Sequence, residues 1–321
     1  MNIFIIGGGG LIGQKLAHAL AQRGTLCGQK IQKITLADIN KPPTVDASFN
    51  VESIPCDIAN AASVQQAIPR DTDVIYLLAA IVSAHAEEDF QTGVNINLFG
   101  TYNVLERCRA MGTKPVVVFT SSIAVYGGDI PDPLGDHSFP NPQTSYGTQK
   151  ATGELFINDY TRKGFVDGRA FRLPTISVRP GKPNRAASSF MSSILREPLN
   201  GQEAICPVDP DFHHYYLSPR KCIENLIKGA ELDAADLGMN RVMQMPGLTL
   251  SIAQMIDAMT AVAGDGPAKL IRWDAQPEIK RIVSGWRFDI HADRAEALGL
   301  QSDDSFADNI RYYLEDDKPS A

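Results

Sequence analysis

A glycine-rich turn near the start of the chain constrains the fold more than any other sequence feature. The apolar segment Ile3–Ile6 leads directly into four glycines, and an amphipathic stretch, Leu11–Arg23, follows. This order predicts a buried strand, a tight turn and a helix. Glycines let the backbone of such a turn approach a pyrophosphate, which the helix N-terminus attracts. The glycines fit two dinucleotide-binding spacings, Gly7-x-x-Gly10-x-x-Gly13 and Gly8-x-Gly10-x-x-Gly13, so the type of turn stays open. The candidate phosphate-site residues are Gly7, Gly10, Leu11, Ile12 and Gly13.

Short apolar runs alternate with amphipathic stretches through the first half of the chain. Several runs are rich in Val and Ile, as in strands that are buried on both faces. The candidate strands are Asn2–Ile6, Lys33–Ala37, Val51–Ile54, Asp73–Leu78, Val116–Thr120 and Arg169–Leu173. The candidate helices are Leu11–Arg23, Ala61–Ile68, Val94–Met111 and Tyr146–Arg162. The alternation predicts an α/β fold with a doubly wound parallel sheet of the Rossmann type, which binds ligands at the carboxyl ends of its strands.

An acidic residue at the end of the second strand indicates which dinucleotide the chain prefers. A carboxylate at the position of Asp38 accepts hydrogen bonds from ribose hydroxyls and repels a 2′-phosphate. Since no arginine follows it directly, we expect NAD as the cofactor. After the third strand, Asp57 has two interpretations. It either reaches the adenine amine, with Ile58 over the ring, or it caps the helix that follows.

The alternation of strands and helices breaks after about residue 173. Proline-rich loops follow, and later amphipathic stretches predict helices at Thr249–Ala263 and Ser305–Leu314. We therefore predict an NAD-binding Rossmann domain of residues 1–173 and 215–247. A smaller C-terminal substrate-binding domain, residues 174–214 and 248–321, is interleaved with it.

Composition excludes several classes of function. The chain has 321 residues, a net charge of −7 and a pI of about 5.4, which argues against a general affinity for nucleic acid or anionic membranes. Five scattered cysteines suggest neither a disulfide framework nor a zinc site. No signal peptide or transmembrane segment is evident, so we expect a cytoplasmic protein.

The histidines raise the question of a metal. His85, His213 and His214 do not complete a tetrahedral ligand set with any Asp or Glu spacing, so we expect no metal. Adjacent histidines in an extended segment point to opposite faces. We interpret the pair as partly buried or as a contact of a substrate loop.

A tyrosine and a lysine four residues apart form the candidate catalytic group. In Tyr146-Gly-Thr-Gln-Lys150 both side chains lie on one face of a helix. The ammonium is expected to lower the pKa of the phenol from about 10 toward neutrality, which makes it a general base for a substrate hydroxyl. Such a pair also occurs on helices without chemistry. Ser121-Ser122, at the end of a strand upstream, supports the catalytic interpretation.

These motifs, in this order, resemble those of the extended short-chain dehydrogenases/reductases over nearly the whole chain. The matching segments are Gly7–Gly13, Leu77–Ala80, Asn97–Thr101, Thr120–Gly127, Tyr146–Lys150 and Asp293–Gly299. Ile6 stands where many members have threonine. The resemblance implies that Ser122, Tyr146 and Lys150 are catalytic, with Lys150 also holding the ribose of NAD. It further implies cofactor contacts by Ala79, Ala80, Asn97, Pro174 and Tyr146.

The substrate is less constrained, because the catalytic motifs serve epimerases and dehydrogenases alike. Nucleotide-sugar members commonly carry an asparagine shortly after the strand that ends at Leu173, and this chain lacks it. The following segment, Arg179–Arg185, resembles that of the D-erythronate dehydrogenases, which oxidise the C2 hydroxyl of a four-carbon sugar acid to a 2-oxo acid. We therefore expect a small sugar acid as substrate. The alternatives are a nucleotide-diphosphate-sugar epimerase or dehydratase and, more remotely, a non-catalytic NAD-binding sensor.

Cationic side chains in the same segment are candidate partners of a substrate carboxylate. Arg179 is the preferred one, since Lys182 and Arg185 equally fit a basic surface loop. Ser83 either hydrogen-bonds the substrate or faces water. Ser122 and Tyr146 would contact the reacting oxygen.

Relatives in this family often form dimers through two helices, here expected at residues 94–111 and 146–162. Leu98, Tyr102, Leu155 and Ile157 occupy apolar positions on these helices. We therefore expect a homodimer.

Overall fold

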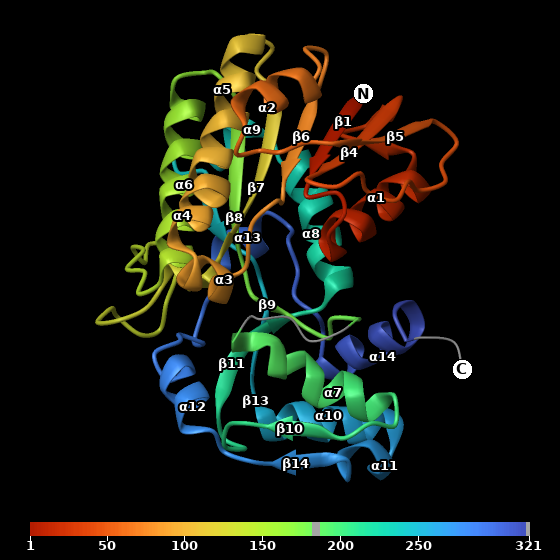
Figure 1. Ribbon diagram of the computed structural model, residues 1–321, viewed down its shortest axis with the longest axis vertical. Helices are drawn as coiled ribbons and strands as arrows, with labels where there is room; N and C mark the ends of the chain where they lie inside the picture. Colours follow the sequence, from red (N-terminus) through yellow and green to blue (C-terminus); the bar gives the residue numbers. More distant parts are fainter. Residues whose placement is uncertain (182–186, 319–321) are drawn as a thin grey trace.

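A seven-stranded parallel sheet lies at the centre of the upper part of the molecule (Figure 1). The computed structural model describes residues 1–181 and 187–318. The strands, in the order in which they neighbour one another, are β5 (Asn50–Pro55), β4 (Lys33–Asp38), β1 (Asn2–Ile6), β6 (Val74–Leu77), β7 (Val116–Ser122), β8 (Asp167–Leu173) and β12 (Val242–Gln244). The order reverses beside β1, as in Rossmann sheets, so the predicted fold class is confirmed.

Helices cover both faces of this sheet. On one face lie α1 (Leu11–Arg23) and α8 (Pro219–Glu231), and on the other lie α2 (Ala61–Ala67), α5 (Thr101–Met111) and α6 (Ser145–Arg162). Strand alternation in β1 divides its side chains between two cores, with Ile3 and Ile5 facing α1 and α8, and Phe4 and Ile6 facing α5 and α6. A sheet that is apolar on both faces explains the continuous apolar runs of the sequence.

The segment between β6 and α5 is more broken than the sequence predicts. It forms α3 (Ser83–Glu88), α4 (Phe90–Gly93) and a π-helical stretch, η1 (Val94–Gly100), before α5 begins. π-Helical turns widen the helix locally and are frequent at functional sites. The sequence predicts one helix over all of 94–111, because hydrophobic periodicity does not distinguish a π-helix from an α-helix.

A smaller lobe lies below the sheet and has its own core (Figure 1). Its strands are β9 (Thr175–Ile176), β11 (His213–Leu217) and β13 (Leu248–Ser251), which form one sheet, and β10 (Ala204–Cys206) and β14 (Ile271–Trp273), which form another. Its helical segments are η3 (Ala187–Ser189), α7 (Phe190–Leu199), α10 (Ile252–Ala263), α11 (Asp265–Ala268), α12 (Pro277–Val283) and α14 (Phe306–Asp316). The remaining short elements are β2 (Thr25–Leu26), β3 (Gln29–Lys30), η2 (Ile123–Val125), α9 (Ala234–Leu237) and α13 (Asp293–Ala297).

The helix predicted at Thr249–Ala263 is wrong at its start. Residues 249–251 belong to β13, where Leu250 pairs with His214 of β11. Ser251 then caps α10, and its side chain and that of Gln254 each bind the other's backbone. The predicted Thr/Ser cap region thus contains the cap, Ser251, but Thr249 and Leu250 before it belong to a strand. Residue 215, where a domain boundary was expected, lies within β11.

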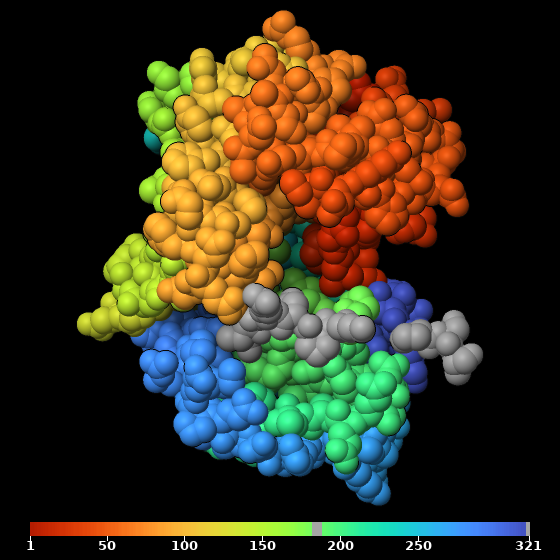
Figure 2. Space-filling model, viewed as in Figure 1, coloured from red at the N-terminus to blue at the C-terminus, as the bar shows by residue number. Residues whose placement is uncertain are grey.

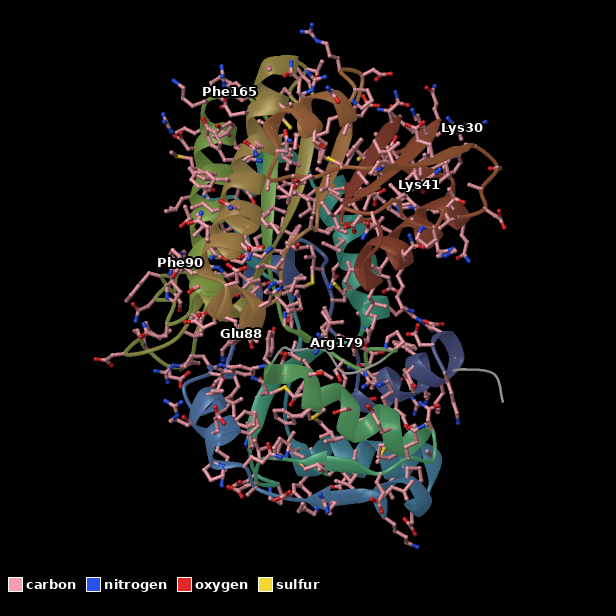
Figure 3. The ribbon with its side chains drawn as sticks, in the orientation of Figure 1. Lys30, Lys41, Glu88, Phe90, Phe165 and Arg179 are labelled. Carbon is pink, nitrogen blue, oxygen red and sulfur yellow. The ribbon has the colours of Figure 1, made fainter. Side chains whose placement is uncertain are left out.

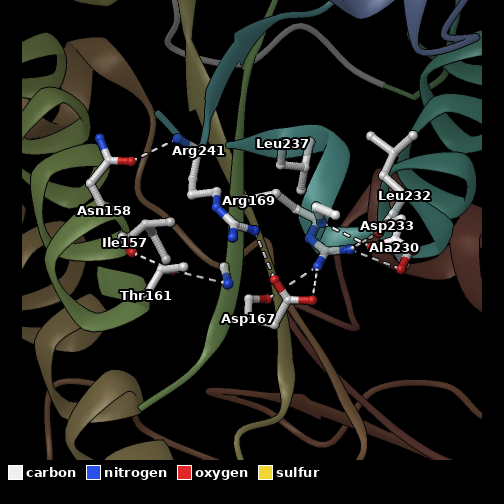
Figure 4. A network of polar contacts seen from close by, with 12 residues as sticks. Ile157, Asn158, Thr161, Asp167, Arg169, Ala230, Leu232, Asp233, Leu237 and Arg241 are labelled. Atoms are coloured by element: carbon white, nitrogen blue, oxygen red, sulfur yellow. Dashed lines mark hydrogen bonds and ion pairs between the residues drawn. The ribbon is translucent and has the colours of Figure 1, made fainter. Parts of the chain in front are cut away.

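A buried arginine fixes α8 against the sheet (Figure 4). Arg169 on β8 is fully buried, and its Nη1 donates to the carbonyls of Gly229, Ala230 and Leu232 at 3.1, 2.9 and 3.2 Å. These carbonyls end α8, where helices lack backbone partners. Asp167 pairs with Arg169 and also with Arg241. Since β11 leads into α8, this anchor also positions the small lobe. No helix among the described residues is long and apolar enough to cross a membrane.

Candidate active site

The glycine turn between β1 and α1 leaves no room for side chains at two positions. Gly7 has a φ of +89°, and a Cβ there would lie 2.7 Å from the backbone nitrogen of Ala79. A Cβ on Gly13 would lie 2.2 Å from the carbonyl oxygen of Gly7. Gly10 begins α1 without any side-chain cap, so the first amides of a 13-residue helix stay open for an anion. The left-handed Gly7 favours the spacing Gly7-x-x-Gly10-x-x-Gly13. Leu11 and Ile12 follow in the first helical turn.

Asp38 ends β4 directly beside this turn. Its Oδ2 accepts a hydrogen bond of 3.0 Å from the amide of Gly9, and its Oδ1 accepts one of 2.8 Å from the amide of Ile39. These bonds hold the carboxylate over the turn and leave lone pairs for hydroxyl donors. The position is the one that sequence reasoning assigned to a ribose contact.

Of the two interpretations of Asp57, an adenine contact and a helix cap, the structure contradicts the helix cap. Asn60, and not Asp57, caps α2, because its Oδ1 accepts from the amides of Ala62 and Ser63. Asp57 instead accepts from the amide of Ala59 at 2.9 Å in the preceding turn. The capping interpretation of Asp57 is therefore wrong. Ile58 is buried against η1.

A cavity of about 310 Å³ lies at the carboxyl ends of β6, β7 and β8, between the sheet and the small lobe. Figure 2 shows the two parts of the molecule meeting at this level. Eight of the predicted site residues line the cavity, namely Ile12, Ala80, Ser83, Ser122, Tyr146, Lys150, Pro174 and Arg179. The fold therefore brings the predicted catalytic and substrate-binding residues together, although they come from segments far apart in the sequence.

The pKa of Tyr146 shifts opposite to the sequence prediction, and the pKa of Lys150 is shifted as well. Burial raises the pKa of Tyr146 to about 12, against a lowering hydrogen bond with Ser122. Burial lowers the pKa of Lys150 to about 7, and the Glu154 carboxylate counteracts this. The Lys150 ammonium donates to the Thr120 carbonyl at 2.7 Å and lies 5.7 Å from the centre of the Tyr146 ring. Desolvation therefore outweighs the expected influence of Lys150 on the phenol in the protein alone.

A buried polar network joins α6, which carries Tyr146 and Lys150, to β7 and β8. Glu154 follows Lys150 by one helical turn on α6 and binds Arg172 through two bonds of 2.8 and 2.7 Å. Ser121 donates to the same carboxylate at 2.5 Å, and Tyr126 bonds to Arg172. Of the two neighbouring serines, Ser121 thus belongs to this network, whereas Ser122 contacts Tyr146.

Asn97 is buried and Ala79 is partly buried, and each adjoins a residue that lines the cavity. The Asn97 amide accepts from the amide of Ile81 at 2.9 Å and donates to Gln149 at 2.8 Å, so its side chain joins the loop after β6 to α6. The amide of Ala79 donates to the carbonyl of Ile6 at 3.0 Å. These contacts hold the backbone at the edge of the cavity.

Arg179 lies at the junction of the two lobes (Figure 3), and it lines the cavity. Burial and the neighbouring Arg196 lower its pKa from the ordinary value. Its backbone contacts Ser192 and Arg196, and among residues 1–181 and 187–318 no carboxylate pairs with its guanidinium. A partly buried cation in this state attracts an anion. Lys182 and Arg185, the other predicted cationic side chains, lie outside the described residues.

Side chains that were not predicted as site residues also line the cavity. Thr175, Trp286 and Arg287 line it, as does His214, which sequence reasoning left between burial and substrate contact. His213 differs from its neighbour, since it lies near the surface against Phe288. Only the position of Thr175 directly after a strand could have signalled its role. The described parts of the chain contain no group of three or more His, Cys, Asp or Glu side chains suited to a metal ion.

A parallel sheet of this order, with a glycine turn and a tyrosine–lysine pair at its carboxyl edge, defines a class of NAD-linked enzymes. Comparison with known families agrees, since the NAD dependent epimerase/dehydratase family matches residues 3–209. The chain belongs to this family, which comprises extended short-chain dehydrogenases/reductases, and it is an NAD-dependent oxidoreductase.

Individual relatives are similar over almost the whole chain. A D-erythronate dehydrogenase of Cupriavidus necator is 48% identical over 320 residues, or 98% of each chain. A D-erythronate dehydrogenase of Haemophilus influenzae is 39% identical over 317 residues, or 99% of this chain and 100% of the relative. A crystal structure named as the nucleoside-diphosphate-sugar epimerase from Agrobacterium tumefaciens has a TM-score of 0.94 and 44% identity, covering 98% of this chain and 94% of that chain. The names of these relatives thus differ in reaction type.

Proposed function

We propose that this protein oxidises the C2 hydroxyl of a small sugar acid such as D-erythronate to a 2-oxo acid, with NAD as the oxidant. The observation that carries the proposal is Arg179, a partly buried cation in the same cavity as Ser122, Tyr146 and Lys150. A carboxylate bound there would hold the adjacent C2 carbon at a fixed distance from the phenol. Two D-erythronate dehydrogenases among the relatives support the proposal.

Arg179 suits the carboxylate better than the other arginine of the cavity. Arg287 also lines the cavity, but it donates to the Gly128 carbonyl at 2.5 Å and pairs with Asp132 at 3.3 Å. Its charge is therefore already matched, whereas the guanidinium of Arg179 has no carboxylate partner among residues 1–181 and 187–318. A planar guanidinium also matches the two oxygens of a carboxylate.

The residues around the glycine turn fit NAD. The uncapped start of α1, at Gly10, and the glycine positions at Gly7 and Gly13 form a cradle for the pyrophosphate. Asp38 would accept from the adenosine ribose, and Lys150 from α6 would donate to the nicotinamide ribose. The remaining proposed contacts are Leu11, Ile12, Asp57, Ile58, Ala79, Ala80, Asn97, Tyr146 and Pro174. When bound, NAD supplies the hydride acceptor and a positive ring beside the phenol.

The side chains of the cavity would then control the proton of the substrate. Tyr146 takes the proton of the C2 hydroxyl, and Ser122 hydrogen-bonds the same oxygen as charge develops there. With its pKa near 12, the phenol needs positive charge nearby to act as a base at neutral pH. Lys150 provides such charge in its protonated form, and Glu154 favours that form. Ser83 is a further proposed contact of the substrate.

We also propose an assembly and a compartment. Exposed aromatic and aliphatic side chains on α4, η1, α5 and α6 would form a homodimer interface; they are Phe90, Phe99, Tyr102 and Leu155. Figure 3 labels the first of them, Phe90. Ile157 was expected there, but it is fully buried in the core. The five cysteines are free thiols, which suits a reducing cytoplasm. Residues 174–214 and 248–321 would bind the substrate, and residues 1–173 and 215–247 would bind NAD.

The test is an assay of NADH formation with the purified protein, NAD and a panel of sugar acids. We expect turnover of D-erythronate with a 2-oxo acid as product, and loss of turnover in Tyr146→Phe. Interconversion of UDP-sugars without net NADH would instead indicate an epimerase. Tight binding of NAD without any turnover would indicate a sensor.

The role of Arg179 is tested by a matched pair of variants in the same cavity. Arg179→Met should raise KM for the acid on the order of 100-fold, because a desolvated charge pair is lost. Arg287→Met keeps Arg179 intact and should change KM much less. Equal effects of the two variants would contradict the assignment of the carboxylate to Arg179.

A further inference from the structure

Thr175 and His214 form a polar pair in the cavity wall that the catalytic group does not use. The two come from neighbouring strands of the small lobe, β9 and β11, and both line the cavity. The Nε2 atom of His214 lies 2.8 Å from the hydroxyl oxygen of Thr175. In the parallel pair, Tyr216 lies opposite Thr175, and His214 stands two residues earlier on the same face of β11.

The histidine of this pair is held in one orientation and in one charge state. Its exposed fraction is 2%, and the rings of Phe212, Tyr216 and Trp286 enclose it with centroid distances of 6.3, 5.5 and 5.3 Å. Burial lowers its pKa to about 3, so the ring is neutral near pH 7. A neutral imidazole has one N–H donor and one acceptor nitrogen.

Hydrogen-bond accounting indicates which nitrogen carries the proton. Nδ1 of His214 is buried and has no hydrogen-bond partner in the described structure. Buried N–H groups without an acceptor are rarer than buried acceptors without a donor. The proton therefore belongs on Nε2, which donates to Thr175 Oγ1. The Thr175 hydroxyl then has its own proton left to donate into the cavity.

A sugar acid carries further hydroxyls that can accept a hydrogen bond from the Thr175 hydroxyl. Arg179 takes the carboxylate and Tyr146 the C2 hydroxyl, so hydroxyls further along the carbon chain still need hydrogen-bond partners in the cavity, which Thr175 lines. A desolvated hydroxyl without a partner costs about 1–3 kcal/mol. A threonine fixed by a buried histidine is preorganised to offset that cost, since its χ1 is stiff and its neighbour cannot rotate.

We propose that Thr175, polarised by His214, is the specificity-determining residue that recognises a substrate hydroxyl beyond C2. This inference rests on the proposed oxidation of a hydroxy acid. It goes beyond that function because it separates polyhydroxy acids from simple 2-hydroxy acids. Thr175 contacts the substrate, and His214 acts on it through Thr175.

The experiment compares two substrates in the same enzyme. D-Erythronate carries hydroxyls beyond C2, and (R)-2-hydroxybutanoate lacks them. In Thr175→Val, which keeps the shape of the side chain, kcat/KM for D-erythronate should fall about tenfold or more relative to kcat/KM for the deoxy acid. Equal losses on both acids, or no loss, would overturn the inference. Absence of turnover with either acid in the unaltered protein would instead refute the proposed function.

Two variants of His214 test whether this residue orients and polarises the Thr175 hydroxyl. They also keep the inference testable if Thr175→Val fails to fold. The side-chain amide of His214→Gln can replace the N–H at the Nε2 position, whereas His214→Leu cannot. We therefore expect the substrate preference to survive in the glutamine variant and to fall at least tenfold in the leucine variant, while both still bind NAD. If both variants keep the preference, His214 does not orient Thr175 and the inference fails.

Discussion

Replacing Glu154 with glutamine tests whether a buried charge pair on α6 stabilises the protein more than an exposed pair on the same helix does. Glu154 and Arg172 have exposed fractions of 2% and 7%, and two hydrogen bonds of 2.8 and 2.7 Å join them. Glu154→Gln keeps the size of the side chain but leaves a buried guanidinium without a counter-charge. Breaking a buried pair in this way costs about 3–5 kcal/mol. For a chain of 321 residues, the unfolding entropy is roughly 0.7 kcal/mol per kelvin, so Tm should fall by about 4–7 °C.

The matched control is Asp159→Asn on the same helix. Asp159 pairs with Arg162 at 2.6 Å, but the two side chains are 57% and 64% exposed. Solvent screens such a pair, so the control should lose no more than about 0.5 kcal/mol. Urea unfolding and thermal scans of both variants measure the difference. A loss in Glu154→Gln no larger than that in Asp159→Asn would refute the reasoning.

Activity gives a second readout of the same change. The Glu154 carboxylate raises the pKa of Lys150, which burial otherwise lowers to about 7. Removing the negative charge should lower this pKa further, so that Lys150 loses its proton at a lower pH. The alkaline limb of the kcat/KM profile should then shift to lower pH in Glu154→Gln and stay in place in Asp159→Asn.

Two more predictions concern the glycine turn and the buried histidine. Gly13→Ala should destabilise the protein by more than about 2 kcal/mol, because its Cβ would lie 2.2 Å from the Gly7 oxygen. In the control, Gly10→Ala, the Cβ meets its nearest atom at 3.4 Å, so the variant should lose less than about 1 kcal/mol of stability. Similar Tm values for the two variants would contradict this prediction. His214 has a lowered folded pKa of about 3, so the folded state excludes a proton that the unfolded chain binds, and stability is lost as pH falls from about 6.5 toward 3. His214→Gln removes this contribution. Between pH 7 and pH 4.5 the variant should therefore lose roughly 2–3 kcal/mol less unfolding free energy than the unaltered protein does. If urea titrations at both pH values show the same loss in both proteins, the low pKa of His214 is contradicted.

Much of the upper lobe could be predicted because its signals are local. The six predicted strands of the central sheet all occur, and β1 and α1 have the predicted bounds. The missed strand, β12, is only three residues long and exists because β8 offers it a partner. In the small lobe, β13 was taken as the start of a helix, since its pairing with β11 leaves no periodic pattern in four residues.

The sequence by itself determined the strand–turn–helix start, the parallel sheet and the common face of Tyr146 and Lys150. These features follow from steric limits at glycine and from the periods of helices and strands, which act over a few residues. Only the tertiary structure decided the directions in which burial shifts the pKa values of Tyr146 and Lys150, the place of Arg179 in the cavity wall, and the pairing of Thr175 with His214. Desolvation depends on what surrounds a group from every direction, and residues far apart in the chain meet only when the two lobes pack.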